Sequence, residues 1–363
     1  MKFVFWQNIL SIHQSAFLRN LAEKYPVTLV VEESIGKERT QEGWIDPNFG
    51  KTDIVVSPDE VHFHQMIENP EAIHVFSGID SFDLASRAFK IAVRQKKRLG
   101  VILEPYDWLG WKGKLRGIKY RILKMLYNNS IEFLLAIGEK GRWCYEHTGF
   151  SRQKIFDWAY FTEKLSFPIP TSHKVLPTVI FVGRLDDNKN VLSLISICRK
   201  YEEKLNKLEI IGNGPLKEQV IEMIQNTKFD YLGTLSNDKV QQKINEADLL
   251  VLPSRYKDGW GAVVNEALMA GVPAIASDYC GSSILLNGFR GKCFSVRKNN
   301  LEEIFVGFLK SLPYCIEEKL KIREWAENNI SGVSAANYFE SIMRHIYSSE
   351  EKPIAPWLKN YTD

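Results

Sequence analysis

Short apolar runs alternate with amphipathic stretches along the first part of the chain. Runs rich in Val, Phe, Leu and Ile indicate strands, and the pattern between some of them indicates helices, as at about residues 14–25 and 83–95. The strand candidates are residues 2–6, 27–31, 54–57, 74–77, 100–103 and 133–136. Strands that are apolar on both faces are typical of parallel sheets covered by helices. The pattern therefore predicts a doubly wound parallel sheet.

The same alternation returns further along the chain. Strand candidates lie at residues 178–182, 208–211, 231–233, 249–252, 274–276 and 293–296. Between the two sets, Pro168, Pro170 and Pro177 lie amid Ser and Thr without a periodic apolar pattern. We therefore predict an α/β protein with two Rossmann-like domains, at residues 1–165 and 178–334, joined by a linker at 166–177.

Composition narrows the class of protein. A chain of 363 residues with 45% hydrophobic and 25% charged residues is typical of a globular protein, and a net charge of +3 is too small to indicate nucleic-acid binding. Five cysteines are scattered without metal-ligand spacing, which favours reduced thiols in the cytoplasm. Gln7, Asn8 and His13 interrupt the first apolar run, so no signal peptide is predicted.

Residues 248–277 hold the most informative pattern. A buried-looking strand ends in a loop with Asp258 and Gly259-Trp260-Gly261, and a helix carrying Glu266 follows. Ligands of open α/β sheets bind at the carboxyl ends of strands. The two acids could bind two regions of one polyhydroxylated ligand, with the glycines letting the backbone approach it. The alternative is a solvated loop acid and a Glu at a helix start.

This stretch resembles the signature of retaining GT-B glycosyltransferases of family four, the glycosyl transferases group 1. The family pattern is an acid, seven residues and a Glu, and here the first acid is Asp258 where the family has Glu. The resemblance implies that Glu266 holds the nucleotide ribose, while Asp258 and the backbone of residues 259–261 hold the donor sugar. The matching residues are Pro253, Ser254, Asp258, Gly259, Trp260, Gly261, Glu266, Ala267, Ala270, Gly271 and Pro273.

A second segment, beginning at Gly183, carries Arg184 and Lys189 in a strand–helix loop. Two cations there suit a diphosphate, and the alternative is two surface cations. The segment resembles the family's GRL…KN element, which implies that both residues hold the donor's diphosphate. Similarly, Gly212 and Gly214 match a family element, and Leu235 falls where the family places the nucleobase edge. Asp258, Glu266, Arg184 and Lys189 form the implied catalytic set.

The acceptor side is predicted by fold analogy. His13 lies in the first strand–helix loop, and Glu104 and Asp107 follow a strand, so all three would face the cleft between the domains. The cleft histidine that the family often has near the Glu104 region is absent. In GT-B proteins the C-terminal helix crosses back to the first domain, which implies that residues 335–363 pack there.

One segment indicates a membrane partner. Residues 111–124 combine basic side chains with Trp, Leu, Ile and Tyr, and no acid intervenes. Such a segment either lies on an anionic membrane surface or forms a solvated basic helix face. The basic residues are Lys112, Lys114, Arg116, Lys119, Arg121 and Lys124.

The family resemblance, taken with these patterns, implies a retaining hexosyltransferase. It would move a hexose-type sugar from a nucleotide-sugar donor to a saccharide or lipid-linked acceptor, in the cytoplasm or on the inner face of the membrane, in bacterial surface polysaccharide assembly. No Asp-x-Asp pair occurs, so we expect no metal and no cofactor beyond the nucleotide-sugar co-substrate. A non-catalytic nucleotide-sugar-binding protein and a sugar-nucleotide epimerase stay open as alternatives.

Overall fold

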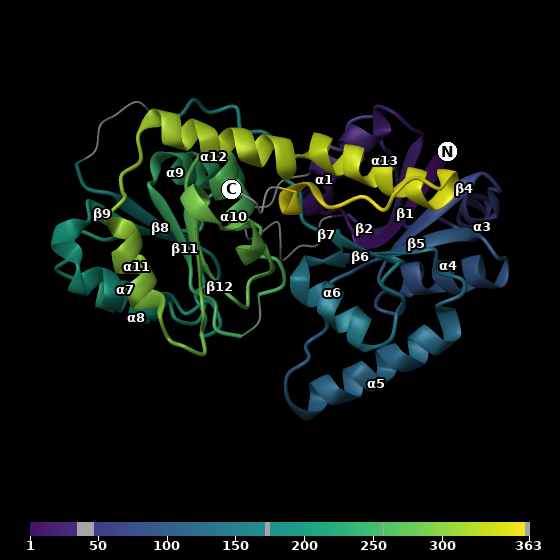
Figure 1. Cartoon of the computed structure of the whole chain (residues 1–363), viewed down its shortest axis with the longest axis horizontal. Helices are drawn as coiled ribbons and strands as arrows, with labels where there is room; N and C mark the ends of the chain where they lie inside the picture. The colour runs from purple at the N-terminus through teal and green to yellow at the C-terminus, as the bar shows by residue number, and fades with distance from the viewer. Residues whose placement is uncertain (35–46, 171–174, 257, 360–363) are drawn as a thin grey trace. The chain divides into compact units, whose positions relative to one another are not determined.

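The computed structural model describes residues 1–34, 47–170, 175–256 and 258–359, which form two compact units (Figure 1). Of these residues, unit 1 holds 1–34, 47–163 and 330–359, and unit 2 holds 164–170, 175–256 and 258–329. Residues 171–174 of the predicted linker and 360–363 of the predicted C-terminal segment lie outside the described residues.

Unit 1 is built on a seven-stranded parallel sheet in the order β3-β2-β1-β4-β5-β6-β7. Each apolar run predicted as a strand contributes one of its strands. The runs in β1, β2, β4, β5 and β6 are largely buried, whereas β3, at the edge of the sheet, is mostly exposed. The strands are β1 (Lys2–Ile9), β2 (Val27–Glu33), β3 (Asp53–Val56), β4 (Ala72–Ser77), β5 (Arg98–Leu103), β6 (Phe133–Ile137) and β7 (Ile155–Trp158). The helices that connect them include α1 (Ile12–Ala22), α3 (Glu60–Glu68), α4 (Asp83–Arg94), α5 (Gly110–Tyr127) and α6 (Gly138–His147).

The C-terminal segment completes the core of unit 1. Helix α13 (Gly332–Ser348) packs on α1, and a Cβ at Gly332 would lie 2.3 Å from the carbonyl oxygen of Ala16, so only glycine allows this approach. Phe339 of α13 contacts the rings of Phe3, Phe5, Phe17, Phe133 and Trp158. The 3-10 turn η4 (Pro356–Leu358) follows, with Trp357 against Phe161.

Unit 2 contains a six-stranded parallel sheet in the order β10-β9-β8-β11-β12-β13. Its strands are β8 (Thr178–Val182), β9 (Lys207–Ile211), β10 (Asp230–Gly233), β11 (Leu249–Leu252), β12 (Ala274–Ser277) and β13 (Gly291–Phe294). Its α-helices are α7 (Val191–Lys200), α8 (Lys217–Met223), α9 (Asn237–Glu246), α10 (Val263–Met269), α11 (Leu301–Leu309) and α12 (Ile316–Asn329), and its short turns are η1 (Glu202–Lys204), η2 (Gly281–Leu285) and η3 (Gly288–Arg290). The predicted α/β class with two Rossmann-like parallel sheets is confirmed.

A buried ion pair fixes the centre of the unit 2 sheet. Lys319 of α12 donates to Oδ1 of Asp248 at 2.9 Å, and Oδ2 of Asp248 accepts the backbone N–H of Thr178 at 3.0 Å. Both carboxylate oxygens are therefore satisfied, as burial of a charge requires. The contact ties α12 to the start of β8 beside β11, the two strands whose far ends carry the predicted site.

Candidate functional site

The predicted donor residues other than Glu266, which lies on helix α10, are on four loops that leave one edge of the unit 2 sheet. Residues 183–189 follow β8, Gly212 and Gly214 follow β9, Leu235 follows β10, and residues 258–261 follow β11. Because β10, β9, β8 and β11 are consecutive neighbours in a parallel sheet, their carboxyl ends meet at one edge. The fold therefore gathers these residues at one place.

Backbone hydrogen bonds join the loop after β8 to the loop after β9. Gly183 donates its N–H to the carbonyl of Ile211, and Leu185 donates to that of Asn213. A Cβ at Gly212 would lie 1.9 Å from the carbonyl oxygen of Gly183, and one at Gly214 would lie 2.4 Å from that of Leu185. Both glycines also have positive φ. Their contribution is close packing of the β8 and β9 loops, which sets where the loop backbone lies.

Two asparagines tie the β8 loop to the β11 loop. The carbonyl of Asn188 accepts the N–H of Arg255 at 2.8 Å, and the Asn190 side-chain amide donates to the carbonyl of Pro253 at 3.2 Å. Asn190 precedes α7 with left-handed φ and ψ of 56° and 33°, a conformation that Asn adopts more readily than most residues. The loop with the predicted diphosphate cations is thus positioned against the loop with Asp258.

Lys189 and Asp258 form the central contact of the site. The Lys189 ammonium donates to Oδ2 of Asp258 at 2.6 Å, with the side chains 21% and 9% exposed. The same oxygen accepts the Ser254 hydroxyl at 2.6 Å and the Cys280 thiol at 3.4 Å. Burial and the Asp258 carboxylate raise the pKa of the Cys280 thiol well above its usual range, so it remains a protonated donor.

Arg184 lies at the outer side of the same loop. Its guanidinium is within 3.5 Å of Oδ2 of Asp186, and its side chain is largely exposed. Asp186 also accepts the backbone N–H of Lys189 at 2.9 Å through Oδ1. Asp186 therefore contacts both the loop backbone at Lys189 and the Arg184 side chain. Because that side chain is largely exposed, its guanidinium is accessible to an anion.

Glu266 of α10 differs from the other acids of the site. Its carboxylate has no hydrogen-bond or ion-pair partner among the residues that the structure describes, although the residue is only partly exposed. Burial without a compensating cation raises its pKa to about 7. Such a carboxylate has its hydrogen-bonding capacity available for the hydroxyl groups of a ligand.

The Trp260 side chain lies in the core, whereas the motif implied a donor contact only for its backbone. Its side chain is 1% exposed, and its indole N–H donates to the Asn265 side chain at 2.8 Å. The ring is therefore a core element beneath the loop, so a ligand could meet only its backbone. The neighbouring carbonyls of Gly259 and Trp260 already accept N–H groups from Gly281 and Ser282.

The predicted acceptor residues lie in unit 1, and the structure brings two of them together. The His13 ring stacks on Tyr160 with centroids 4.7 Å apart and an interplanar angle of 4°, and the Tyr160 hydroxyl donates to the Glu104 carboxylate. Asp107 is held separately by Arg116 of α5, at 3.1 Å. The sequence patterns did not single out Tyr160, because it lies in a short apolar run directly after β7.

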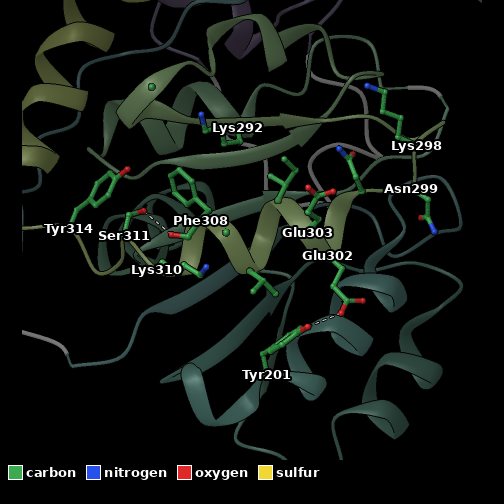
Figure 2. A pocket seen from close by; sticks show the side chains of 15 residues that line it. Tyr201, Lys292, Lys298, Asn299, Glu302, Glu303, Phe308, Lys310, Ser311 and Tyr314 are labelled. Atoms are coloured by element: carbon green, nitrogen blue, oxygen red, sulfur yellow. Dashed lines mark hydrogen bonds between the residues drawn. The ribbon is translucent and has the colours of Figure 1, made fainter.

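A pocket of about 1040 Å³ lies elsewhere in unit 2, beside α11 (Figure 2). None of the predicted site residues lines it. Its lining carries both signs of charge, from Lys292, Lys298, Lys310, Glu302 and Glu303, and Glu302 already accepts a hydrogen bond from Tyr201 (Figure 2). It therefore offers no convergent set of groups for one charge type.

Three predicted groups consequently stand out for a ligand: the exposed Arg184 guanidinium, the Lys189 ammonium, which Asp258 already engages, and the Glu266 carboxylate, which has no partner among the described residues. Sequence patterns found all three, but not the contacts of Ser254 and Cys280 with Asp258. The only signal for those contacts was Ser254's place in the motif, since Cys280 lies after the next strand, β12.

Comparisons with known proteins bear on the family and the fold. Residues 164–304 match the family described as glycosyl transferases group 1. A 41.2 kDa protein of the cps region of Klebsiella pneumoniae is 23% identical over 76% of this chain and 78% of its own length. An alpha-1,4-N-acetyl-D-galactosaminyltransferase of Campylobacter jejuni, whose name includes a PP-undecaprenol-linked saccharide, is 26% identical over 56% of this chain and 55% of its own.

Among solved structures, Anabaena HepE in complex with UDP has a TM-score of 0.70 at 14% identity, over 96% of this chain and 100% of that chain. At this identity the likeness shows the fold alone, which is the predicted GT-B fold. The matched residues 164–304 contain every predicted donor residue. The part of the chain that carries the predicted donor residues therefore matches the glycosyl transferases group 1, and the chain as a whole has the GT-B fold.

Proposed function

We propose that the chain transfers a hexose-type sugar, with retention of anomeric configuration, from a nucleotide-sugar donor to a saccharide or lipid-linked saccharide acceptor. The observation that carries the proposal is a set of groups on the loop after β8 and on α10, the helix that follows the loop after the neighbouring strand β11. Arg184 and Lys189 supply positive charge there, and the partly exposed Glu266 carboxylate has no partner among the described residues. That combination suits a ligand with a diphosphate and free hydroxyl groups.

The cations would act on the leaving group. Breaking the bond between the sugar and a nucleoside diphosphate accumulates negative charge on the phosphate that leaves. Arg184 and Lys189, on the loop that leads into α7, would neutralise that charge in place of solvent. When a diphosphate binds, the Lys189 ammonium would share its hydrogen bonds between the phosphate and Asp258, whose contact already holds it in position.

The remaining residues would orient the substrates. Glu266 would accept hydrogen bonds from the nucleotide ribose, and Asp258 with the backbone of residues 259–261 would meet the donor sugar. On the acceptor side, His13, Glu104 and Asp107 are the candidates in unit 1. We propose a front-face displacement in which the leaving phosphate helps to take the acceptor proton, without a metal ion. Activity that persists in EDTA would support the last point, and its loss with recovery on adding a divalent metal would reject it.

The biological setting is also a proposal. The relatives whose names mention a cps region and a PP-undecaprenol-linked saccharide support a role in bacterial surface polysaccharide assembly. A lipid-linked acceptor would place the reaction in the cytoplasm at the inner face of the membrane.

The proposal can be tested by a thermal-shift screen with UDP, GDP, CDP and ADP. A ligand that binds only the folded state raises the unfolding midpoint. We expect one nucleotide to raise it, and we expect Glu266→Ala and Arg184→Ala to lose that shift. Glu302→Ala and Lys298→Ala, in the pocket beside α11, are the matched controls and should keep it.

The products formed from a nucleotide sugar then distinguish the transferase from the epimerase and from the non-catalytic binding protein. Transfer to an acceptor with retained configuration, read from the anomeric proton coupling of the product, supports the proposal, and an inverted product rejects retention. Conversion of the nucleotide sugar without any acceptor would indicate the epimerase. Binding of a nucleotide without turnover on any acceptor would indicate the non-catalytic protein.

A further inference from the structure

Helix α5 is fixed to unit 1 along one side only. A Cβ at Gly113 would lie 2.1 Å from the carbonyl carbon of Trp108, so the helix lies directly against the preceding backbone. Leu123 is buried in the core cluster, and Tyr120 and Tyr127 pack against that cluster. Figure 1 shows α5 as a long helix at the outer edge of unit 1.

The opposite side of α5 is an apolar stripe in solvent. Trp111 is 68% exposed and Met125 is 81% exposed, although burial is the usual state of such side chains. The other members, Leu115, Ile118, Ile122 and Leu126, are each at least 50% exposed. Their spacing of three and four residues puts all six on one face, at about 100° of rotation per residue. Contiguous exposed apolar surface of this kind marks an interaction site.

Basic residues border this apolar stripe on both sides. The same helical spacing puts Lys112 and Lys119 along one border and Lys114 and Arg121 along the other. Lys119 is paired with Asp80 of unit 1 at 2.7 Å. Lys112, Lys114 and Arg121 are exposed and have no carboxylate partner among the residues described, and α5 itself contains no acid.

We propose that α5 lies in the surface of an anionic lipid bilayer, with the apolar stripe below the headgroups and the bordering basic residues among them. A second copy of the chain is a poorer occupant, because packing stripe on stripe would bring two sets of unpaired cations together. Trp143 of α6 is 41% exposed, and its ring centroid lies 6.2 Å from that of Trp108. It adds a second indole beside the start of α5. Indole rings favour the headgroup level.

This inference goes beyond the transfer reaction and beyond charge attraction alone, because insertion of the stripe makes binding persist when salt screens the basic residues. No helix within the described ranges is long and apolar enough to cross a bilayer. The helix would therefore act as an anchor in one leaflet, and it would place unit 1, with its acceptor candidates, at the surface where a lipid-linked acceptor lies.

The test is flotation of the whole chain with phosphatidylcholine vesicles that contain or lack phosphatidylglycerol, at low and high salt. We expect binding to the anionic vesicles that falls but persists at high salt. Leu115→Ser/Ile118→Ser/Ile122→Ser should lower binding at least tenfold and abolish the salt-resistant part. Lys112→Gln/Lys114→Gln/Arg121→Gln should remove the preference for anionic vesicles. Val61→Ser/Leu320→Ser, at exposed apolar positions elsewhere, is the control and should bind normally.

Three results would overturn the proposal. These are no binding to anionic vesicles at low salt, binding that the serine substitutions leave unchanged, and self-association by sedimentation that those substitutions abolish while vesicle binding is unaffected. The nucleotide thermal shift is measured on the same variants. It depends on unit 2, so a failure of membrane binding is distinguishable from a failure of the proposed transferase function.

Discussion

The predicted donor residues of unit 2 and the predicted acceptor residues of unit 1 both follow the carboxyl ends of parallel strands, but they are held in different ways. In unit 2, Asp258 is engaged by the Lys189 ammonium, and Asp186 by the Arg184 guanidinium. In unit 1, Asp107 is likewise paired with a cation, Arg116, but the Glu104 carboxylate is engaged by a neutral phenol, that of Tyr160, whose ring stacks on His13.

This difference indicates what each region can bind. Cations held in position by carboxylates can stabilise an anion without reorganising, as a departing diphosphate requires. Around Glu104 and His13 in unit 1, the neutral donor and the aromatic stack carry no such charge, and they suit a ligand that offers hydroxyl groups. We therefore expect substitutions in unit 2 to change the chemical step most, and those in unit 1 to change acceptor binding.

The largest effect is expected for Lys189→Met. Loss of one preorganised charge at a leaving group typically lowers kcat by about 100-fold to 1000-fold, and we expect a fall of that size in kcat/KM for the nucleotide sugar. Steady-state release of nucleoside diphosphate measures it. Lys298→Met, which removes a lysine of the pocket beside α11, should leave the rate within about twofold.

The double variant Lys189→Met/Asp258→Asn separates the effect of Lys189 on activity from its effect on stability. Lys189→Met leaves a carboxylate that is 9% exposed without its cation, so it should also lower the unfolding midpoint. Replacing Asp258 by Asn in the same chain should restore stability but not activity. If activity recovers together with stability, Lys189 acts only through the fold and the comparison between the two units fails.

Much of this site was predictable from local sequence, and its internal contacts were not. The apolar runs predict the strands, so they also predict that residues after those strands lie at one edge. The contact of Lys189 with Asp258 depends on β8 pairing with β11, which no local pattern reports. The buried state of Trp260 depends on Asn265, a residue with no signal of its own in the motif.

In unit 1, too, the positions of residues were predictable from local sequence but their contacts were not. His13 and Glu104 were predicted from their places after strands, but Tyr160, which joins them, lies after β7 in an apolar run that also fits a buried strand. The exposed stripe of α5 was predictable only as a basic segment with apolar residues. Which side of that helix is buried depends on where Gly113 meets Trp108.

The second largest effect that we expect is a pH dependence of stability that is caused by Glu266. The pKa of Glu266 is raised to about 7 in the folded chain, against about 4.3 when unfolded, so the folded state binds more protons between these values. The free energy of unfolding should therefore fall as pH rises from about 4.3 to about 7, and Glu266→Gln should lack this fall. Unfolding midpoints of the two proteins should be similar at pH 4, with the variant higher at pH 8.

The affinity for the nucleotide should rise with pH, although the free energy of unfolding falls. Above pH 7 the ionised carboxylate accepts hydrogen bonds from the ribose, so the affinity for the nucleoside diphosphate should rise between pH 6 and 8 by several-fold to about tenfold. Calorimetric titration of the wild type and Glu266→Gln measures it, with Glu302→Gln as the control. Parallel pH profiles for wild type and Glu266→Gln would mean that this carboxylate does not contact the nucleotide.

The smallest effect is expected for Tyr160→Phe in unit 1. The change removes the hydrogen bond to Glu104 and keeps the ring that stacks on His13, and a single hydrogen bond is worth about 0.5–1.5 kcal/mol. We expect the acceptor KM to rise by about twofold to tenfold, with the donor KM unchanged. Tyr201→Phe, which removes a phenol–carboxylate hydrogen bond to Glu302 in unit 2, is a matched control and should change neither. An altered donor KM in Tyr160→Phe would contradict the assignment of the acceptor to unit 1, because Tyr160 would then act on the nucleotide sugar.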